Sequence, residues 1–225
     1  MKRSSSTLAH RLDGHFLACT AAVGAAASLA PSQEANATII YVNLTSTPIS
    51  IPVTTAGVYL NVVTGVSNVS PASVPGWDLN PFSTTTLSWF NPTTPVGGVY
   101  VTGLGSSATL VDNLTIGTLI SAASVFGSGA SETTGTTALI LNSSNNFIGF
   151  RFTNETTGVV DFGWVQVQLG ATLTSPRSIV AYGYENTGLG ITAGAIPEPG
   201  TYATLGLMAL GAFGVRLWKR AAGAS

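Results

Sequence analysis

The chain has 225 residues and a formal net charge of −1, and only 8% of its residues are charged. Soluble domains usually have about 25% charged residues, so hydroxyl and amide groups must supply most of the polar surface here. The cations gather near the two ends, and residues 38–196 hold two arginines against six carboxylates. So few cations cannot neutralise a row of phosphates, which argues against nucleic-acid binding.

The first 37 residues have the order of a secretory signal peptide. A polar, basic stretch (1–15) precedes an uncharged alanine-rich run (16–30), and Ala35-Asn36-Ala37 supplies a small-x-small site. This order predicts export with cleavage after Ala37. An organelle presequence or a buried helix would explain the run less well. Lipid attachment at Cys19 is disfavoured, because no apolar run precedes that cysteine.

Residues 38–196 read as one body built of short strands. Runs rich in Val, Ile, Thr and aromatic residues recur between Gly, Asn, Pro and Ser, and no long amphipathic pattern interrupts them. The expected strands are Thr38–Asn43, Val58–Val63, Thr86–Phe90, Val99–Thr102, Ala138–Leu141, Phe147–Thr153, Val159–Leu169 and Ser178–Glu185. This pattern predicts an all-β fold with an antiparallel β-sandwich or jelly-roll-like body. A parallel β-helix is the alternative, but the sequence has no fixed-period repeat. Residues 103–137 give no clear assignment.

Two of these runs alternate cleanly between apolar and other residues. Ile148, Phe150 and Phe152 share one face of the first run, with Arg151 on the other. In the next run Val165, Val167 and Leu169 oppose Trp164, Gln166 and Gln168. Residues 154–158 between them have turn composition, so the two runs are predicted to form an antiparallel hairpin.

The last 29 residues, 197–225, form a tail of three parts. Pro197, Glu198 and Pro199 precede an apolar run that starts at residue 202, and a basic cluster of Arg216, Lys219 and Arg220 follows. The run predicts one hydrophobic helix over 202–218, which spans a membrane if Arg216 snorkels and Trp218 lies at the interface. Basic residues stay in the cytoplasm, so the body should lie on the far side. The two prolines predict an extended, accessible segment at 196–200.

This tail resembles the PEP-CTERM sorting signal of Gram-negative bacteria. All three parts occur in order at the C-terminus, although five residues follow Arg220 and the basic cluster is modest. The resemblance implies recognition by an exosortase, a membrane-embedded enzyme similar to cysteine transpeptidases. It also implies association with extracellular polysaccharide and biofilm matrix. The expected route is export across the inner membrane, transient anchoring through the tail, and then the cell surface or the extracellular matrix.

Catalytic chemistry is restricted by what the mature body lacks. His10, His15 and Cys19 all lie in the predicted signal, and residues 38–196 contain no His, Cys, Lys or Met. A Ser-His-Asp or Cys-His nucleophile, a His/Cys zinc site and a disulfide are therefore excluded. No cofactor, metal or enzymatic activity is expected.

Carboxylates and aromatic rings remain as candidate site residues. The six carboxylates single out no catalytic pair by spacing, and the Asp-Asn pairs near residues 78 and 112 favour loop-stabilising turns over calcium ligands. The aromatic residues that could stack on sugars also fit a core or cross-strand role. Trp164, Tyr182 and Tyr184 are the candidate ligand-binding residues.

The leading functional hypothesis is a non-catalytic structural or interaction protein of the cell surface or matrix. A carbohydrate-binding module is the alternative, and a carboxylate-based glycan hydrolase is the second alternative. A row of exposed aromatic rings would favour the module, whereas a cleft with two facing carboxyls would favour the hydrolase.

Overall fold

The structure is a computed structural model, and it describes residues 38–105 and 109–197. The predicted signal peptide, including Ala37, lies outside the described residues, as do Glu198, Pro199, the predicted helix at 202–218 and the basic cluster. Within the described ranges, the only helical element is the short 3-10 turn η1 (Pro71–Ser73). No helix in these ranges is long and apolar enough to cross a membrane.

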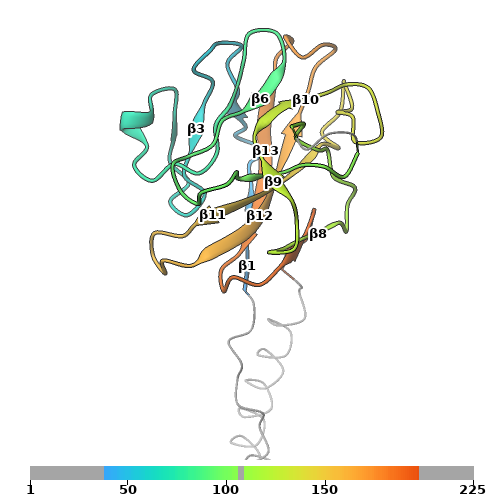
Figure 1. Cartoon of the computed structure of the whole chain (residues 1–225). Coiled ribbons are helices and arrows are strands. Elements are labelled where there is room, and N and C mark those ends of the chain that lie inside the picture. Colours follow the sequence, from blue (N-terminus) through green and yellow to red (C-terminus); the bar gives the residue numbers. More distant parts are fainter. Residues whose placement is uncertain (1–37, 106–108, 198–225) are drawn as a thin grey trace, which may run out of the picture. The chain divides into compact units, whose positions relative to one another are not determined.

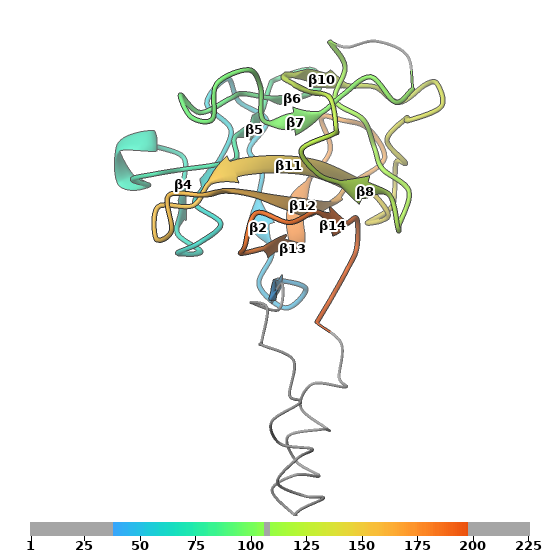
Figure 2. The ribbon, with the colours of Figure 1, turned by 60° about the horizontal axis from the view of Figure 1, so that its bottom comes forward.

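One antiparallel sheet organises the body. Its strands follow the spatial order β1, β13, β12, β11, β7, β9, and β2 pairs with the remaining length of β13 beside β1 (Figures 1 and 2). The bounds are β1 (Ile39–Asn43), β2 (Ile49–Ser50), β7 (Tyr100–Val101), β9 (Phe126–Gly127), β11 (Phe147–Thr153), β12 (Val160–Gln168) and β13 (Ser178–Glu185). The three longest strands are neighbours, so they form the frame on which the other segments pack.

Three smaller antiparallel pairings cover this sheet. The first has the order β10, β6, β5, the second joins β3 to β4, and the third joins β14 to β8. Their bounds are β3 (Tyr59–Leu60), β4 (Ser67–Asn68), β5 (Pro81–Phe82), β6 (Leu87–Trp89), β8 (Leu119–Ile120), β10 (Gly129–Ser131) and β14 (Ile191–Thr192). The body is therefore a sandwich-like, antiparallel all-β structure, as the sequence predicts.

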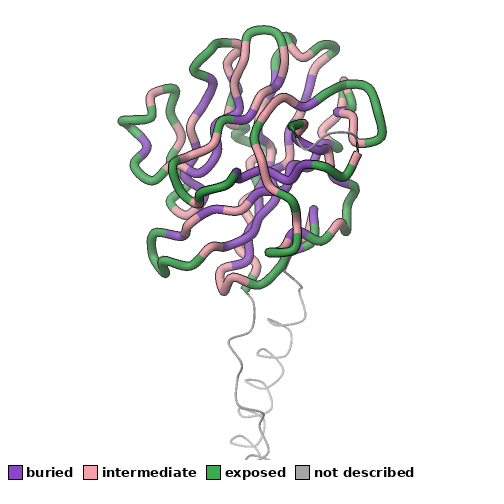
Figure 3. The backbone as a smooth tube through the Cα atoms, in the orientation of Figure 1, coloured by how far each residue is buried: buried purple, intermediate pink, exposed green. Residues whose placement is uncertain are grey.

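Both faces of the main sheet are buried. Because successive strand side chains point to opposite faces, Phe150 and Val165 lie in one apolar cluster, whereas Phe147 and Trp164 lie in another. The larger face, which carries Phe150, is covered by β3, β6 and their loops. The smaller face, which carries Trp164, is covered by β8, β14 and nearby residues. Figure 3 shows the burial concentrated along the central strands.

The predicted hairpin is confirmed. β11 pairs with β12 from Phe147 opposite Gln166 to Thr153 opposite Val160. In the turn, the Gly158 N–H donates to the Asn154 carbonyl at 2.7 Å, and Gly158 adopts a φ of 71°, which favours glycine. The register shift between Gln166 and Val167 leaves Val180 of β13 without an opposite residue on β12, so Ile179 joins Tyr182 in the core of the larger face.

Seven of the eight predicted strands are confirmed, including the short strands β3, β6 and β7, which lie within the predicted ranges Val58–Val63, Thr86–Phe90 and Val99–Thr102. The remaining short strands, β2, β4, β5, β8, β9, β10 and β14, are not predicted by the sequence. β11 and β13 have the predicted bounds, and β1 and β12 differ by one residue at one or both ends. The predicted strand at Ala138–Leu141 is wrong. There the Ile140 N–H donates to Asn146 Oδ1 at 2.7 Å, and Asn146 Nδ2 donates back to the Ile140 carbonyl at 3.0 Å. This buried asparagine satisfies the backbone that a neighbouring strand would otherwise satisfy.

Candidate binding hollow

Trp164, Tyr182 and Tyr184 do not form a surface for a ligand. Their side chains are 2%, 2% and 6% exposed. Trp164 lies on the smaller face and the two tyrosines lie on the larger face, because they occupy positions of opposite parity in the paired strands. The prediction that these residues bind a ligand is therefore wrong. Because this sheet is covered on both sides, aromatic side chains on either face belong to the core.

A different group of aromatic side chains reaches the surface. The Trp77 cluster consists of Tyr59, Trp77, Phe82 and Phe90. The Tyr59 ring meets Trp77 edge-on at 5.0 Å between centroids, and Phe90 stacks near Trp77 at 6.3 Å. Phe90 is 56% exposed, and the other three side chains are half-buried. These four residues come from separate loops and strand ends, so local sequence patterns do not bring them together.

A hollow of about 230 Å3 opens beside Trp77. Three chain segments meet there: the loop before β5, the loop after β6, and the end of β11 with its turn. The lining residues are Gly76, Trp77, Asp78, Pro92, Thr93, Thr94, Thr153 and Glu155. The Trp77 hollow thus combines one large ring with three threonines and two carboxyl groups.

Buried side chains fix the walls of the hollow. Asn61 Nδ2 donates to the carbonyls of Pro75 and Gly76 at 3.0 and 2.9 Å, and also to Glu155 Oε1. Gly76 has a φ of 65°, and a Cβ there would lie 2.0 Å from Glu155 Oε1. Glycine is therefore required for the loop and the glutamate to approach this closely. These contacts hold the hollow in shape before any ligand arrives.

Asp78 gives the hollow an unusual carboxyl group. Its Oδ2 accepts a hydrogen bond from the Val62 N–H at 2.9 Å, and its side chain is 4% exposed. Burial raises the pKa of Asp78 to about 8, and the neighbouring Glu155 adds to the increase while the Val62 bond opposes it. At neutral pH the protonated form predominates, so this carboxyl can both donate and accept hydrogen bonds.

The other predicted Asp-Asn pair serves to connect loops. Asp112 accepts hydrogen bonds from the Leu104 N–H at 2.8 Å and the Thr137 hydroxyl at 2.6 Å. Asn113 donates to the Ala138 carbonyl at 2.9 Å. Within residues 38–105 and 109–197, no group of three or more His, Cys, Asp or Glu side chains is placed to hold a metal ion.

The described chain ends at the start of the predicted sorting segment. Ile196 and Pro197 are exposed and belong to no strand or helix. Just before them, the Ala195 carbonyl accepts a hydrogen bond from Trp164 Nε1 at 3.2 Å. The folded body therefore ends at a fixed point, and the last two described residues, Ile196 and Pro197, are accessible.

Comparison with protein families identifies this segment. Residues 195–221 match the PEP-CTERM protein-sorting motif, as the tail predicts. A motif of this kind implies an exported protein that an exosortase processes and sorts to the surface. Comparisons with curated proteins and with solved structures returned no match. The chain thus carries a PEP-CTERM protein-sorting motif at residues 195–221, after an all-β body.

Proposed function

We propose that the body is a non-catalytic interaction module that binds extracellular polysaccharide in the Trp77 hollow. The observation that carries this proposal is the partly exposed ring of Trp77 at the edge of a hollow lined by hydroxyl and carboxyl groups. Sugar rings present apolar C–H faces and many hydroxyls. A ligand site for them needs an aromatic surface beside a few fixed polar groups.

The polar groups of the hollow suit a neutral glycan. Thr93, Thr94 and Thr153 have hydroxyls that can donate or accept, and the protonated Asp78 adds another donor. The body contains two arginines, and both donate to backbone carbonyls elsewhere. A strongly anionic glycan would therefore find little charge complementarity here.

A hydrolase would use the same two carboxyls differently. Glycoside hydrolysis requires one carboxyl as a general acid and another as a base or nucleophile. Here Asp78 accepts the Val62 N–H, and Glu155 accepts Asn61 Nδ2, so both also hold loops together. These structural bonds favour binding over catalysis, and the experiment below separates the two activities.

The test is a glycan-array screen of residues 38–197, followed by calorimetry on any glycan that binds. Removing the Trp77 ring by Trp77→Ala should weaken binding about fivefold, since a ring contact contributes about 1 kcal/mol. Tyr41→Ala removes a half-buried ring from the smaller face and should leave the affinity unchanged. Binding that is insensitive to Trp77→Ala contradicts the proposed site.

Incubation of the bound glycan with the protein distinguishes the hydrolase. If the wild type releases new reducing ends and Asp78→Asn does not, the protein catalyses hydrolysis with its carboxyl groups, and the non-catalytic proposal is refuted. A constant number of reducing ends supports it.

We further propose that the tail anchors the precursor in the membrane until the exosortase acts. The apolar run, the basic cluster after it and the sorting motif support this order of events. Replacing Pro197-Glu198-Pro199 with alanines should leave a membrane-held, unprocessed form in the native host. Deleting 197–225 should release a soluble body into the periplasm. Fractionation and immunoblotting compare both variants, and normal surface display of the alanine variant would contradict the proposal.

A further inference from the structure

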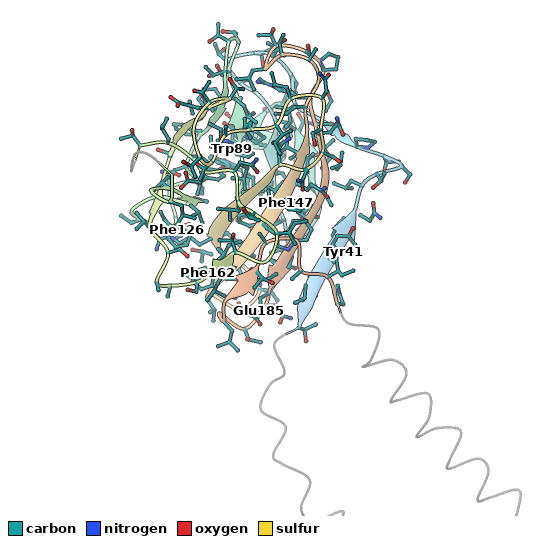
Figure 4. All side chains as sticks on the ribbon, turned by 90° about the vertical axis from the view of Figure 1, so that its right-hand side faces the viewer. Tyr41, Trp89, Phe126, Phe147, Phe162 and Glu185 are labelled. Atoms are coloured by element: carbon teal, nitrogen blue, oxygen red, sulfur yellow. The ribbon has the colours of Figure 1, made fainter. Side chains whose placement is uncertain are left out.

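Among residues 38–105 and 109–197, no strand pairs with the outer edge of β1. β1 ends the strand order and pairs with β13 on one side, from Ile39 opposite Glu185 to Asn43 opposite Ala181. In Figure 4 β1 lies at the margin of the sheet, with Tyr41 near its middle. Edge strands of this kind are templates on which another strand can pair.

The ladder register tells which groups face outward. The Leu44 N–H donates to the Val180 carbonyl at 2.9 Å, so Leu44 and Val180 form a hydrogen-bonded antiparallel pair. Hydrogen-bonded and non-hydrogen-bonded pairs alternate along such a ladder, so Val42 and Ile40 also bond to β13. The backbone N–H and C=O groups of Ile39, Tyr41 and Asn43 consequently point away from the sheet.

Sequence features that usually block an open edge are missing from β1. The strand reads Ile-Ile-Tyr-Val-Asn, with no charged residue and no proline, and its register with β13 runs without a bulge. Natural edge strands are commonly protected by lysine, proline or bulges. β1 is also held firmly, because Ile40 and Val42 pack on the core of the larger face and Ile39 and Tyr41 pack on that of the smaller face.

We propose that two copies of this protein associate by antiparallel pairing of their β1 strands, centred on Tyr41. The strand is self-complementary in this register. Tyr41 faces the partner's Tyr41, Ile39 faces the partner's Asn43, and Ile40 faces the partner's Val42, so no like charges meet. Two-fold symmetry makes the same surface serve both copies. The main sheet then continues from one body into the next.

The strength of this contact is limited by its size. Three outward-facing pairs with two bonds each supply six backbone hydrogen bonds, and the side chains of five residues flank them. An interface of one strand pair is small compared with stable protein complexes. The association is therefore concentration-dependent, and sedimentation equilibrium over a range of concentrations is the appropriate measurement.

The strand pairs of the described part of the chain lie between residues 39 and 192, so residues 38–197 form the unit to be tested. Tyr41→Pro removes an N–H that faces outward and therefore costs no bond to β13. The matched control Tyr41→Ala loses the same ring but keeps the N–H. The dimer dissociation constant should rise at least tenfold in Tyr41→Pro and stay within about twofold of the wild type in Tyr41→Ala. A dimer that Tyr41→Pro leaves intact uses another surface and overturns the proposal.

Cysteine cross-linking tests the register without a proline. The only cysteine of the chain is Cys19, so a single introduced thiol in residues 38–197 can form a disulfide only between copies. Hydrogen-bonded antiparallel partners have Cα atoms about 5.5 Å apart, which is within the disulfide range. Tyr41→Cys should therefore cross-link on oxidation. Val66→Cys, at a side chain that is 46% exposed beside β4, should not. Equal cross-linking of the two variants, or a wild type that stays monomeric at every concentration, refutes the pairing.

Discussion

The two faces of the main sheet are covered in different ways. On the larger face, loops around β3, β5 and β6 cover the core, and buried polar side chains attach them to the sheet. On the smaller face, the two-residue pair of β8 and β14 covers the core, and backbone bonds such as that from the Ala193 N–H to the Thr118 carbonyl hold it. The stability of the larger face should therefore depend more on single polar side chains.

The two arginines of the body show this difference most directly. Arg177 is 3% exposed, and its guanidinium donates to five carbonyls, including those of Ile51 and Ser83 in the layer over the larger face. Arg151 extends from the smaller face, is partly exposed, and donates to the carbonyls of Val96 and Gly98. Its guanidinium carbon lies 4.6 Å from the centre of the Phe126 ring.

The largest effect is expected from Arg177→Met. This change removes a donor from several buried carbonyls, each of which costs about 1–3 kcal/mol when left unsatisfied. The free energy of unfolding should fall by about 3 kcal/mol or more. Arg151→Met is the matched control, and it should cost about 1 kcal/mol. Urea denaturation measures both, and equal losses would remove the distinction between the two faces.

A smaller effect is expected from adding one methyl group to each face. A Cβ at Gly163, on the larger face, would lie 2.4 Å from Phe150 Cζ and 2.8 Å from the Gly183 carbonyl oxygen. A Cβ at Gly149, on the smaller face, would meet side-chain atoms of Val101, Leu114 and Ile120 at 2.7–3.0 Å. A backbone oxygen can move away from a new methyl group less easily than the end of a side chain can. Gly163→Ala should therefore lower the free energy of unfolding by about 3 kcal/mol, and Gly149→Ala by about 1–2 kcal/mol. Thermal and urea unfolding measure the loss in both variants. A larger loss in Gly149→Ala than in Gly163→Ala would mean that the smaller face is the more rigid one.

The pH dependence of stability tests the buried carboxyl in the Trp77 hollow. Burial raises the pKa of Asp78 from its ordinary value of 3.8 to about 8, so between these values the folded state binds more protons than the unfolded state. The contribution of Asp78 to stability is then fully present below pH 3.8 and is lost as pH rises toward about 8. Asp78→Asn should flatten the decline of unfolding free energy across this window. A parallel decline in both proteins would show that Asp78 ionises at its ordinary pKa.

No effect is expected from reductant. Residues 38–197 contain no cysteine, so neither face can depend on a disulfide. The melting temperature of the mature protein, purified after processing in its native host, should be the same with and without dithiothreitol. A decrease on reduction would mean that the purified protein retains Cys19 and was not cleaved after Ala37.

The sequence by itself determined the sorting motif, the all-β class and the central hairpin. The sorting motif is defined by the order of Pro197 and the apolar and basic residues after it, so it can be recognised without knowledge of tertiary packing. β11 and β12 are long enough to show a clear alternation of apolar and other residues, and Gly158 supplies the turn conformation between them.

Tertiary structure decided which aromatic residues are buried and where a ligand could bind. Trp164 and Tyr182 lie on opposite faces of the main sheet, and both are buried because this sheet is covered on both sides. Short strands such as β8, β10 and β14 exist because a partner segment, distant in sequence, supplies their hydrogen bonds. The Trp77 hollow likewise needs Asn61 to join residues 75–76 to Glu155, which is 94 positions away. Such long-range contacts depend on how the layers pack, and local sequence patterns contain no information about that packing.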